Sequence, residues 1–170
     1  MKTWKKVLLV LIVLFIIIQF IRPNKNNSTA AQPANIEHLY ATNDDVKNIL
    51  SKSCYDCHSN NTDYPWYFNI QPVAWWLDSH INEGKQHLNF DEFGNYSAAR
   101  KYHALQESIE QVKEGEMPLN SYTWIHTDAK LSDAQRKEFI DWCEAIRADL
   151  KANYPADSLK MKRPPKPQED

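Results

Sequence analysis

Cys54, Cys57 and His58 carry the clearest chemistry in this sequence, in the stretch Cys-Tyr-Asp-Cys-His. C-x-x-C-H is the attachment signature of c-type haem. Two thiols are needed to add across the two vinyl groups of one porphyrin, and the two intervening residues set the reach between those groups. The adjacent imidazole then binds the iron as proximal ligand. The motif therefore predicts one covalently attached haem c, with Cys54 and Cys57 as thioether anchors and His58 as an iron ligand.

Three other interpretations of this pattern stay open: a chance match, half of a zinc site and a redox dithiol. A zinc finger or ribbon needs a second pair of ligands at metal spacing, whereas the third cysteine, Cys143, stands alone. A thioredoxin-like dithiol needs a βαβ context, and the sequence shows no alternation of strands and helices. Cys143 itself is most simply a buried residue of a late helix.

A single attachment motif leaves the sixth position of the iron to another residue. The candidates are two methionines and four histidines: Met117, Met161, His80, His87, His103 and His126. Met117 is favoured because it stands in a loop between Gly115 and Pro118, a setting that can hold a thioether rigidly toward a buried iron. A methionine that fills a gap in the core is the alternative. Ligation by His58 and Met117 would raise the reduction potential, which suits electron transfer.

Aromatic residues are concentrated just after the motif. Haem is a large apolar plate that needs a dry pocket to set its potential. Tyr64, Trp66, Trp75 and Trp76 are the candidates for the walls of that pocket, and ordinary core packing is the alternative role for them. Val73–Leu77 opens a helix that we expect to end near Gly84.

Helical spacing accounts for most of the remaining chain. Thr42 or Asn43 is the predicted N-cap of a helix that ends on Cys54. Ser97 is the predicted cap of a helix to about Glu114, with Gly115 as its C-cap, and Ser132 with Gln135 predicts a capping box for the last helix. The expected core comprises Val46, Ile49, Leu50, Ala104, Leu105, Ile109, Val112, Phe139, Ile140, Trp142, Cys143, Ile146 and Leu150. With only 3 glycines in the chain, the predicted fold class is all-α rather than a turn-rich β-sandwich.

The N-terminal region contains a strongly apolar run, Val7–Ile21, which is interrupted only by Gln19. Three lysines precede it, which predicts an N-terminus on the cytoplasmic side. The run is shorter than the roughly 20 residues of a typical span, although Trp4 can extend it at the interface. We expect an uncleaved transmembrane anchor over residues 1–22, and a cleaved signal peptide is the alternative.

The remaining organisation follows from composition. Residues 23–35 are polar and predict a flexible linker. Residues 36–153 are expected to form the haem-binding domain, and residues 154–170 a disordered, proline-rich tail. Residues 1–30 hold five of the 20 basic residues and no acidic one, so the rest of the chain carries 15 basic against 22 acidic residues. That acidic body argues against nucleic acid as a partner, because phosphate binding needs clustered positive charge.

Several short motifs together resemble known haem proteins. The order of four features is typical of class I cytochromes c: the attachment motif, a downstream proline, a Met-Pro loop and a final amphipathic helix. More closely, residues 36–150 resemble the small haem-binding domain family of Bacteroidetes-type membrane-anchored proteins. The matching stretches are CYDCHSN, YPWY, Pro72 with Trp75-Trp76, HINEGKQHLNF, GEMPL and a Leu-Ser-Asp helix start.

The resemblance implies a mono-haem, mainly helical, cytochrome c-like domain, in a family without a well-defined reaction. In class I cytochromes, a proline carbonyl accepts a hydrogen bond from the proximal histidine. The resemblance therefore makes Pro72 the candidate acceptor for His58, with Pro65 as the alternative. Such a hydrogen bond orients and tunes a ligating imidazole.

These observations favour an electron carrier over an enzyme. In bacteria, c-type haem is attached outside the cytoplasmic membrane, so we expect a single-pass protein of the inner membrane with its haem domain in the periplasm. Its partners would be redox proteins of the periplasm or membrane. An enzyme of peroxidase type is the first alternative and needs an open iron position with a distal acid–base residue such as His80, His87 or His126. A gas or redox sensor with a labile distal ligand is the second.

Overall fold

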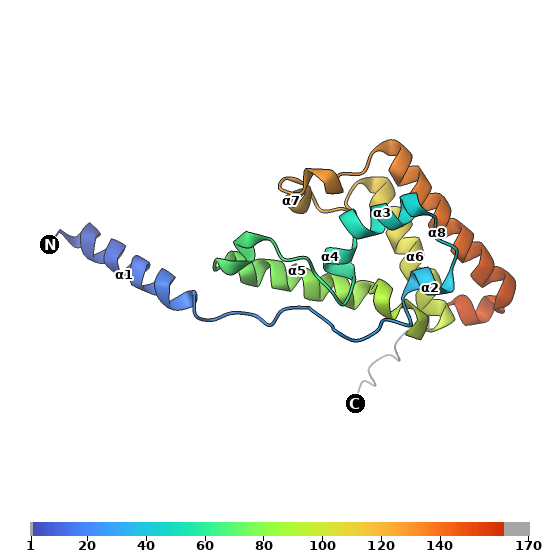
Figure 1. Cartoon of the computed structure of the whole chain (residues 1–170), viewed down its shortest axis with the longest axis horizontal. Coiled ribbons are helices and arrows are strands. Elements are labelled where there is room, and N and C mark those ends of the chain that lie inside the picture. The colour runs from blue at the N-terminus through green and yellow to red at the C-terminus, as the bar shows by residue number, and fades with distance from the viewer. Residues whose placement is uncertain (1, 162–170) are drawn as a thin grey trace, which may run out of the picture. The chain divides into compact units, whose positions relative to one another are not determined.

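The computed structural model describes residues 2–161, and over this range the chain forms helices and turns (Figure 1). Within that range the only β-type pairing is an isolated bridge between Asn27 and Asn61. The predicted all-α class is confirmed. The chain divides into two compact units: unit 1 comprises residues 1–30 and 55–89, and unit 2 comprises residues 31–54 and 90–170.

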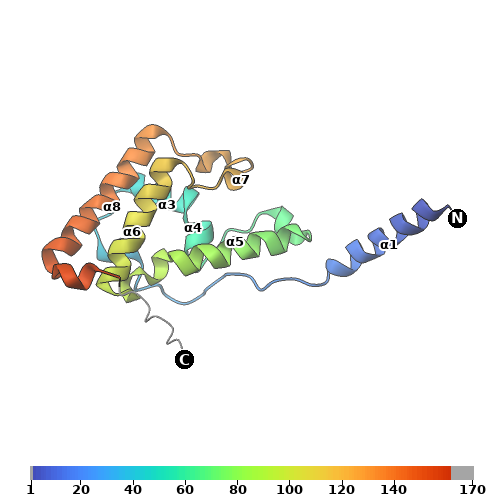
Figure 2. The same cartoon turned by 180° about the vertical axis from the view of Figure 1, so that it is seen from behind.

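Unit 1 contains α1 (Thr3–Ile18), α4 (Tyr55–His58), the 3-10 helix η1 (Trp66–Asn69) and α5 (Val73–His87). Helix α1 has 16 residues, none of them buried, and it stands clear of α5 in both views (Figures 1 and 2). Among residues 2–161, no helix combines the length and the apolar character needed to cross a membrane. The transmembrane helix predicted from the sequence is therefore not supported by the structure.

The interior of unit 1 is small and partly polar. Its buried apolar side chains are Phe68, Ala74, Ile81 and Leu88, and Ser59, Gln71 and Asn89 are buried beside them. The buried Gln71 is held by hydrogen bonds rather than by apolar contacts alone. Its backbone N–H donates to Gln19 Oε1 at 2.9 Å, and its side-chain Nε2 donates to the Ile21 carbonyl at 2.8 Å. Hydrogen bonds thus join the end of α1 to the start of α5.

Unit 2 contains the longer helices. It comprises α2 (Ile36–Leu39), α3 (Asp44–Ser53), η2 (Phe90–Asn95), α6 (Ala98–Glu114), α7 (Asn120–Thr123), η3 (Thr127–Ala129), α8 (Asp133–Asn153) and η4 (Ala156–Leu159). Helices α6 and α8 lie side by side in both views (Figures 1 and 2).

The helix boundaries of unit 2 follow from its capping residues. Asn43 accepts from the Val46 N–H and begins α3, and Ser97 accepts from the Arg100 N–H and begins α6. Ser132 forms the predicted capping box with Gln135 at the start of α8. These side chains satisfy backbone donors that a helix N-terminus would otherwise leave unpaired, so the sequence predictions for these three starts are confirmed.

The core of unit 2 is built from the apolar faces of α3, α6 and α8. Leu105 on α6, Leu50 on α3 and Cys143 on α8 have no exposed surface at all. Every residue of the predicted core is buried except Ile140, which is only partly buried. Each fully buried leucine or isoleucine stabilises the fold by about 1.5–3 kcal/mol.

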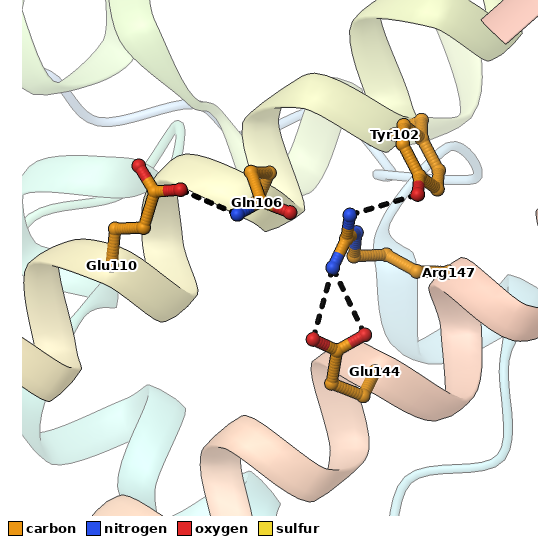
Figure 3. Close-up of polar contacts among 5 residues, drawn as sticks. All are labelled: Tyr102, Gln106, Glu110, Glu144 and Arg147. Atoms are coloured by element: carbon orange, nitrogen blue, oxygen red, sulfur yellow. Dashed lines mark hydrogen bonds and ion pairs between the residues drawn. The ribbon is translucent and has the colours of Figure 1, made fainter.

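A polar contact joins α6 to α8 beside this core. The buried Arg147 donates from Nη1 to both carboxylate oxygens of Glu144 at 2.9 Å and from Nη2 to Tyr102 Oη at 2.8 Å (Figure 3). The Arg147 guanidinium also lies over the Tyr102 ring, 4.4 Å from its centroid. Gln106 and Glu110, also in Figure 3, are hydrogen-bonded within α6. Unit 2 therefore combines an apolar core with a buried and paired cation.

The segment predicted to be a disordered tail begins with ordered structure. Helix α8 ends at Asn153, and residues 156–159 form η4, whose Ser158 and Lys160 side chains bond within the segment. Residues 162–170, which complete the predicted tail, lie outside the described range.

Candidate haem-binding site

The attachment motif begins where α3 ends. Cys54 is the C-cap of α3, and its N–H donates to the Leu50 carbonyl at 3.0 Å. The sequence prediction that this helix ends on Cys54 is confirmed. Tyr55–His58 then form α4, which belongs to unit 1. Neither Cys54 nor Cys57 is in a disulfide, and both are partly buried, so each keeps the thiol that thioether formation requires.

His58 is oriented by a backbone carbonyl. Its Nδ1 lies 2.9 Å from the carbonyl oxygen of Leu88, the residue that ends α5. A carbonyl only accepts, so Nδ1 carries the proton, and in the neutral imidazole the lone pair is then on Nε2. Metal-binding histidines usually donate a hydrogen bond of this kind from the ring nitrogen that does not bind the metal.

The prediction that Pro72 or Pro65 supplies this carbonyl is wrong. The Pro72 carbonyl accepts the Trp76 N–H at 3.2 Å, and the Pro65 carbonyl accepts the Phe68 N–H at 3.0 Å. Each carbonyl therefore belongs to the first turn of the helix that follows it. The Leu88 carbonyl takes this role because the C-terminal end of α5 lies next to the motif. The spacing along the sequence from His58 does not reveal this long-range contact.

The pKa shifts of Cys57 and His58 differ from those expected at a redox dithiol. Burial lowers the pKa of His58, partly offset by the carbonyls of Leu88 and Gly84, so the imidazole stays neutral, as a metal ligand must be. Burial, with the Asp56 carboxylate adding to it, raises the pKa of Cys57 from 9.0 to about 11. Redox-active C-x-x-C pairs have a lowered thiol pKa, so this shift argues against that alternative.

Gly84 lets α5 approach the motif closely. A Cβ placed on Gly84 would lie 2.8 Å from the carbonyl oxygen of Cys57 and 3.2 Å from its Cβ. Only glycine fits this contact without a shift of backbone. The expected helix end near Gly84 is therefore wrong: α5 continues to His87, and the glycine serves a close approach between helices rather than a helix end.

Hydrogen bonds fold the loop after the motif back onto α4. The Asp56 side chain accepts the Asp63 N–H at 2.9 Å, and the Asp56 carbonyl accepts the Thr62 hydroxyl at 2.7 Å. Asn89, next to Leu88, donates to the Asn60 side chain at 2.8 Å. The loop and the end of α5 are thus both fixed around His58.

Asn26 makes several long-range hydrogen bonds that the sequence did not reveal, because this residue lies in the segment expected to be a flexible linker. Its side-chain Nδ2 donates to the Ser59 carbonyl and to Thr62 Oγ1, both at 3.0 Å. Its backbone N–H donates to Tyr64 Oη at 2.7 Å, and its Oδ1 accepts from Lys85 Nζ. The segment around Asn26 is therefore ordered, and it is bonded to the loop after the motif and to α5.

The predicted aromatic wall residues differ in their surroundings. Tyr64 packs inside unit 1, with its ring centroid 4.1 Å from that of Phe68. Trp66, Trp75 and Trp76 expose 75%, 37% and 46% of their surface, and Trp76 lies edge-on to the His80 ring at 4.7 Å. Their role as haem-pocket walls stays a prediction.

Met117 lies in unit 2, in a loop with defined backbone geometry. Gly115 turns the chain out of α6 with a φ of 80°, a left-handed conformation that glycine adopts readily. The N–H groups of Glu116 and Met117 then both donate to the Gln111 carbonyl, at 2.9 and 3.2 Å. Met117 is partly buried. Since His58 belongs to unit 1, the pairing of these two residues on one iron stays a prediction.

The other distal candidates have contacts of their own. His80 and His87 lie on α5, and His103 is an exposed residue of α6 paired with Glu107 at 3.5 Å. The His126 ring is stacked on Tyr122 at 4.3 Å. Met161 is 53% exposed at the end of the described range, and exposure of this kind disfavours it as a ligand in a dry pocket.

A helical fold with a C-x-x-C-H motif, and with its histidine oriented through Nδ1, defines a haem protein. Comparison of the sequence with known families agrees: residues 13–145 match the haem-binding domain family, and the chain belongs to that family. This also confirms the resemblance drawn from the sequence.

A curated relative adds a second comparison. The chain is 29% identical over 108 residues to cytochrome c peroxidase Ccp of Escherichia coli (strain K12). The aligned region covers 62% of this chain but only 23% of that peroxidase, so the chain spans about a quarter of its relative. No solved structure matches this chain.

Proposed function

We propose that this protein is a membrane-tethered, mono-haem c-type cytochrome that transfers single electrons. The observation that carries the proposal is the hydrogen bond from His58 Nδ1 to the Leu88 carbonyl at 2.9 Å, which orients the imidazole of the attachment motif and fixes its proton on Nδ1. Cys54 and Cys57 would hold the porphyrin through thioether bonds, and His58 would bind the iron. When bound, the haem supplies a ferric–ferrous couple that accepts or releases one electron.

The residues around the motif then have distinct tasks. The Leu88 carbonyl fixes the imidazole plane and raises its basicity as a ligand. Gly84 lets α5 pack closely against Cys57, and Asp56 bonds α4 to the loop that follows it. Met117, as the proposed second iron ligand, would exclude water and peroxide from the iron. A closed iron favours electron transfer over chemistry on small molecules.

The proposed location rests on α1. Large apolar side chains over residues 7–17 are each between 46% and 57% exposed, and a continuous apolar surface of this kind marks an interaction site. We propose that α1 is embedded in the cytoplasmic membrane, with the haem domain on the periplasmic side, where its redox partners would be found. Membrane fractionation of the full chain, before and after alkaline carbonate washing, tests this location. Recovery of the chain in the wash would contradict it.

Expression of the full chain with the cytochrome c maturation machinery tests the cofactor. A pyridine haemochrome spectrum typical of two thioether bonds is expected, and a spectrum typical of unattached haem, or none, would contradict covalent attachment. The ferric protein should show a band at about 695 nm, where methionine–iron ligation absorbs. Met117→Ala should remove this band, whereas Met161→Ala, the matched control in the exposed C-terminal segment, should keep it.

A peroxidase is the second candidate, because the curated relative is a cytochrome c peroxidase. It requires an open or labile iron position and an acid–base residue such as His80 or His87. Rapid CO binding by the reduced wild-type protein, with peroxide consumption that is lost in His80→Ala or His87→Ala, would favour this candidate over the carrier.

A further inference from the structure

We infer that unit 1 carries a second membrane-binding element besides α1, a surface that lies on the lipid headgroups. This surface, called the aromatic face below, consists of Phe20, Ile21, Trp66, Ile70 and Trp75. Their exposed fractions are 83%, 57%, 75%, 38% and 37%. The inference rests on the proposed insertion of α1 and goes beyond it, because it assigns an orientation to the haem-bearing unit.

Hydrogen bonds hold the two chain segments of the aromatic face together just after α1. Trp75 Nε1 donates to the Ile21 carbonyl at 3.0 Å. Arg22 Nη1 donates to Asn69 Oδ1 at 3.3 Å, within the segment between Trp66 and Ile70. The Gln19 side chain donates to the Gln71 carbonyl at 3.3 Å and accepts the Gln71 N–H at 2.9 Å. Residues 19–22 and 66–75 are therefore fixed against each other.

The chemistry of this surface fits a bilayer rather than a soluble partner. Its first residues, Phe20 and Ile21, follow closely in sequence after α1 ends at Ile18, and the large apolar side chains of α1 are exposed as well. Tryptophan side chains concentrate at the level of the headgroups because their rings are apolar and their N–H is polar. Arg22, which follows directly in sequence, supplies a positive charge for anionic phospholipids.

Charge distribution favours unit 1 over unit 2 for this contact. The part of unit 1 that follows α1 has three basic and four acidic residues, a net charge of −1, whereas unit 2 has fourteen basic and eighteen acidic residues, a net charge of −4. An anionic membrane therefore repels unit 2 more strongly. The haem motif residues Cys57 and His58 would then lie in the unit that rests on the membrane.

Spin labelling of the full, haem-loaded chain tests the inference. Trp66→Cys and Ile70→Cys variants would each carry a nitroxide, since the two motif thiols are consumed as thioethers and Cys143 is buried. The proteins would be reconstituted in vesicles of phosphatidylethanolamine and phosphatidylglycerol. Lys113→Cys, at an exposed position of α6 in unit 2, is the matched control, and unchanged haem absorption would show that each variant is folded.

We expect the labels at positions 66 and 70 to collide more with apolar oxygen, and less with a water-soluble nickel chelate, than the label at position 113. Equal accessibility at all three positions would overturn the inference. A label at Val10→Cys separates the two proposals. If it is accessible to oxygen while the labels at 66 and 70 behave like the control, α1 is embedded but the aromatic face is wrong. If the Val10 label itself behaves like the control, the insertion of α1 is wrong.

Discussion

Unit 1 and unit 2 achieve stability by different means. Among the residues that the structure describes, unit 2 buries seventeen apolar side chains and unit 1 only four. Unit 1 depends instead on side-chain hydrogen bonds, with Asn26 and Gln71 as its centres. A hydrogen bond contributes only about 0.5–1.5 kcal/mol net, so this network compensates poorly for a small apolar core.

The difference indicates which unit would gain more stability from a bound apolar cofactor. Unit 1, which holds Cys57 and His58, has a small apolar interior, whereas unit 2 is well packed. A porphyrin is an extensive apolar surface, and its burial would contribute in proportion to the area removed from water. Haem is therefore expected to stabilise unit 1 selectively, and unit 2 to fold without it.

Removal of both thioether anchors is expected to have the largest effect. In Cys54→Ala/Cys57→Ala, covalent haem is lost, and amide protection in α4 and α5 should fall toward that of a locally unfolded segment, with an opening free energy near zero. Helices α6 and α8 should keep their protection. Hydrogen exchange followed by mass spectrometry measures both units in one sample. Equal loss of protection in the two units would contradict the comparison.

A cavity in unit 2 is expected to produce the next largest effect. Leu105 has no exposed surface, and leucine-to-alanine changes at such sites lower the free energy of unfolding by about 2–5 kcal/mol. Leu105→Ala should do so without altering the haem spectrum of the folded protein, because the lost contacts belong to the core of unit 2. Lys113→Ala, at an exposed position of the same helix, should change stability by less than about 0.5 kcal/mol in denaturant titrations.

Gly84→Ala is expected to lower the stability of unit 1 by less than the cavity lowers that of unit 2, and to change the haem signal as well. Its Cβ would lie 2.8 Å from the Cys57 carbonyl oxygen, and such overpacking typically lowers stability by about 1–3 kcal/mol. Because α4 must shift, the yield of attached haem or its absorption spectrum should change as well.

Gly94→Ala is the matched control in unit 2. A Cβ on Gly94 would lie 3.1 Å from Ala34, so stability should also fall, but the haem signal of the folded protein should be retained. A haem signal that is equally disturbed in both variants would show that Gly84 has no special relation to the motif.

Much of unit 2 could be predicted from its sequence because its determinants are local. Asn43, Ser97 and Ser132 begin helices through side-chain bonds to residues three positions away. Gly115 ends α6 with the positive φ that glycine permits. The periodic apolar residues between these caps then become the core.

The site in unit 1 was less predictable because its determinants are far apart in the chain. The motif itself was identified from its spacing, but the carbonyl that orients His58 comes from Leu88, 30 residues later. Asn26 stabilises the loop after the motif from 33 residues before Ser59. A lone asparagine in a polar segment, or a carbonyl at a helix end, carries no signal in the sequence.

The smallest expected effect concerns the alkaline stability of unit 2. Burial raises the pKa of Tyr40 above 10.0, and the charges of Asp149 and Tyr154 add to it. Between pH 10 and the folded pKa, the folded chain binds more protons at this site than the unfolded chain, so the free energy of unfolding falls as the pH rises. Tyr40→Phe keeps the ring beside Phe93 but has no group to titrate. Its unfolding free energy, measured by denaturant titration from pH 9 upward, should therefore fall less steeply with pH than that of the wild type. The difference in slope should correspond to less than one proton released on unfolding. The raised thiol pKa of Cys143 is common to both proteins and cancels in the difference, so identical slopes would assign the alkaline sensitivity of unit 2 to groups other than Tyr40.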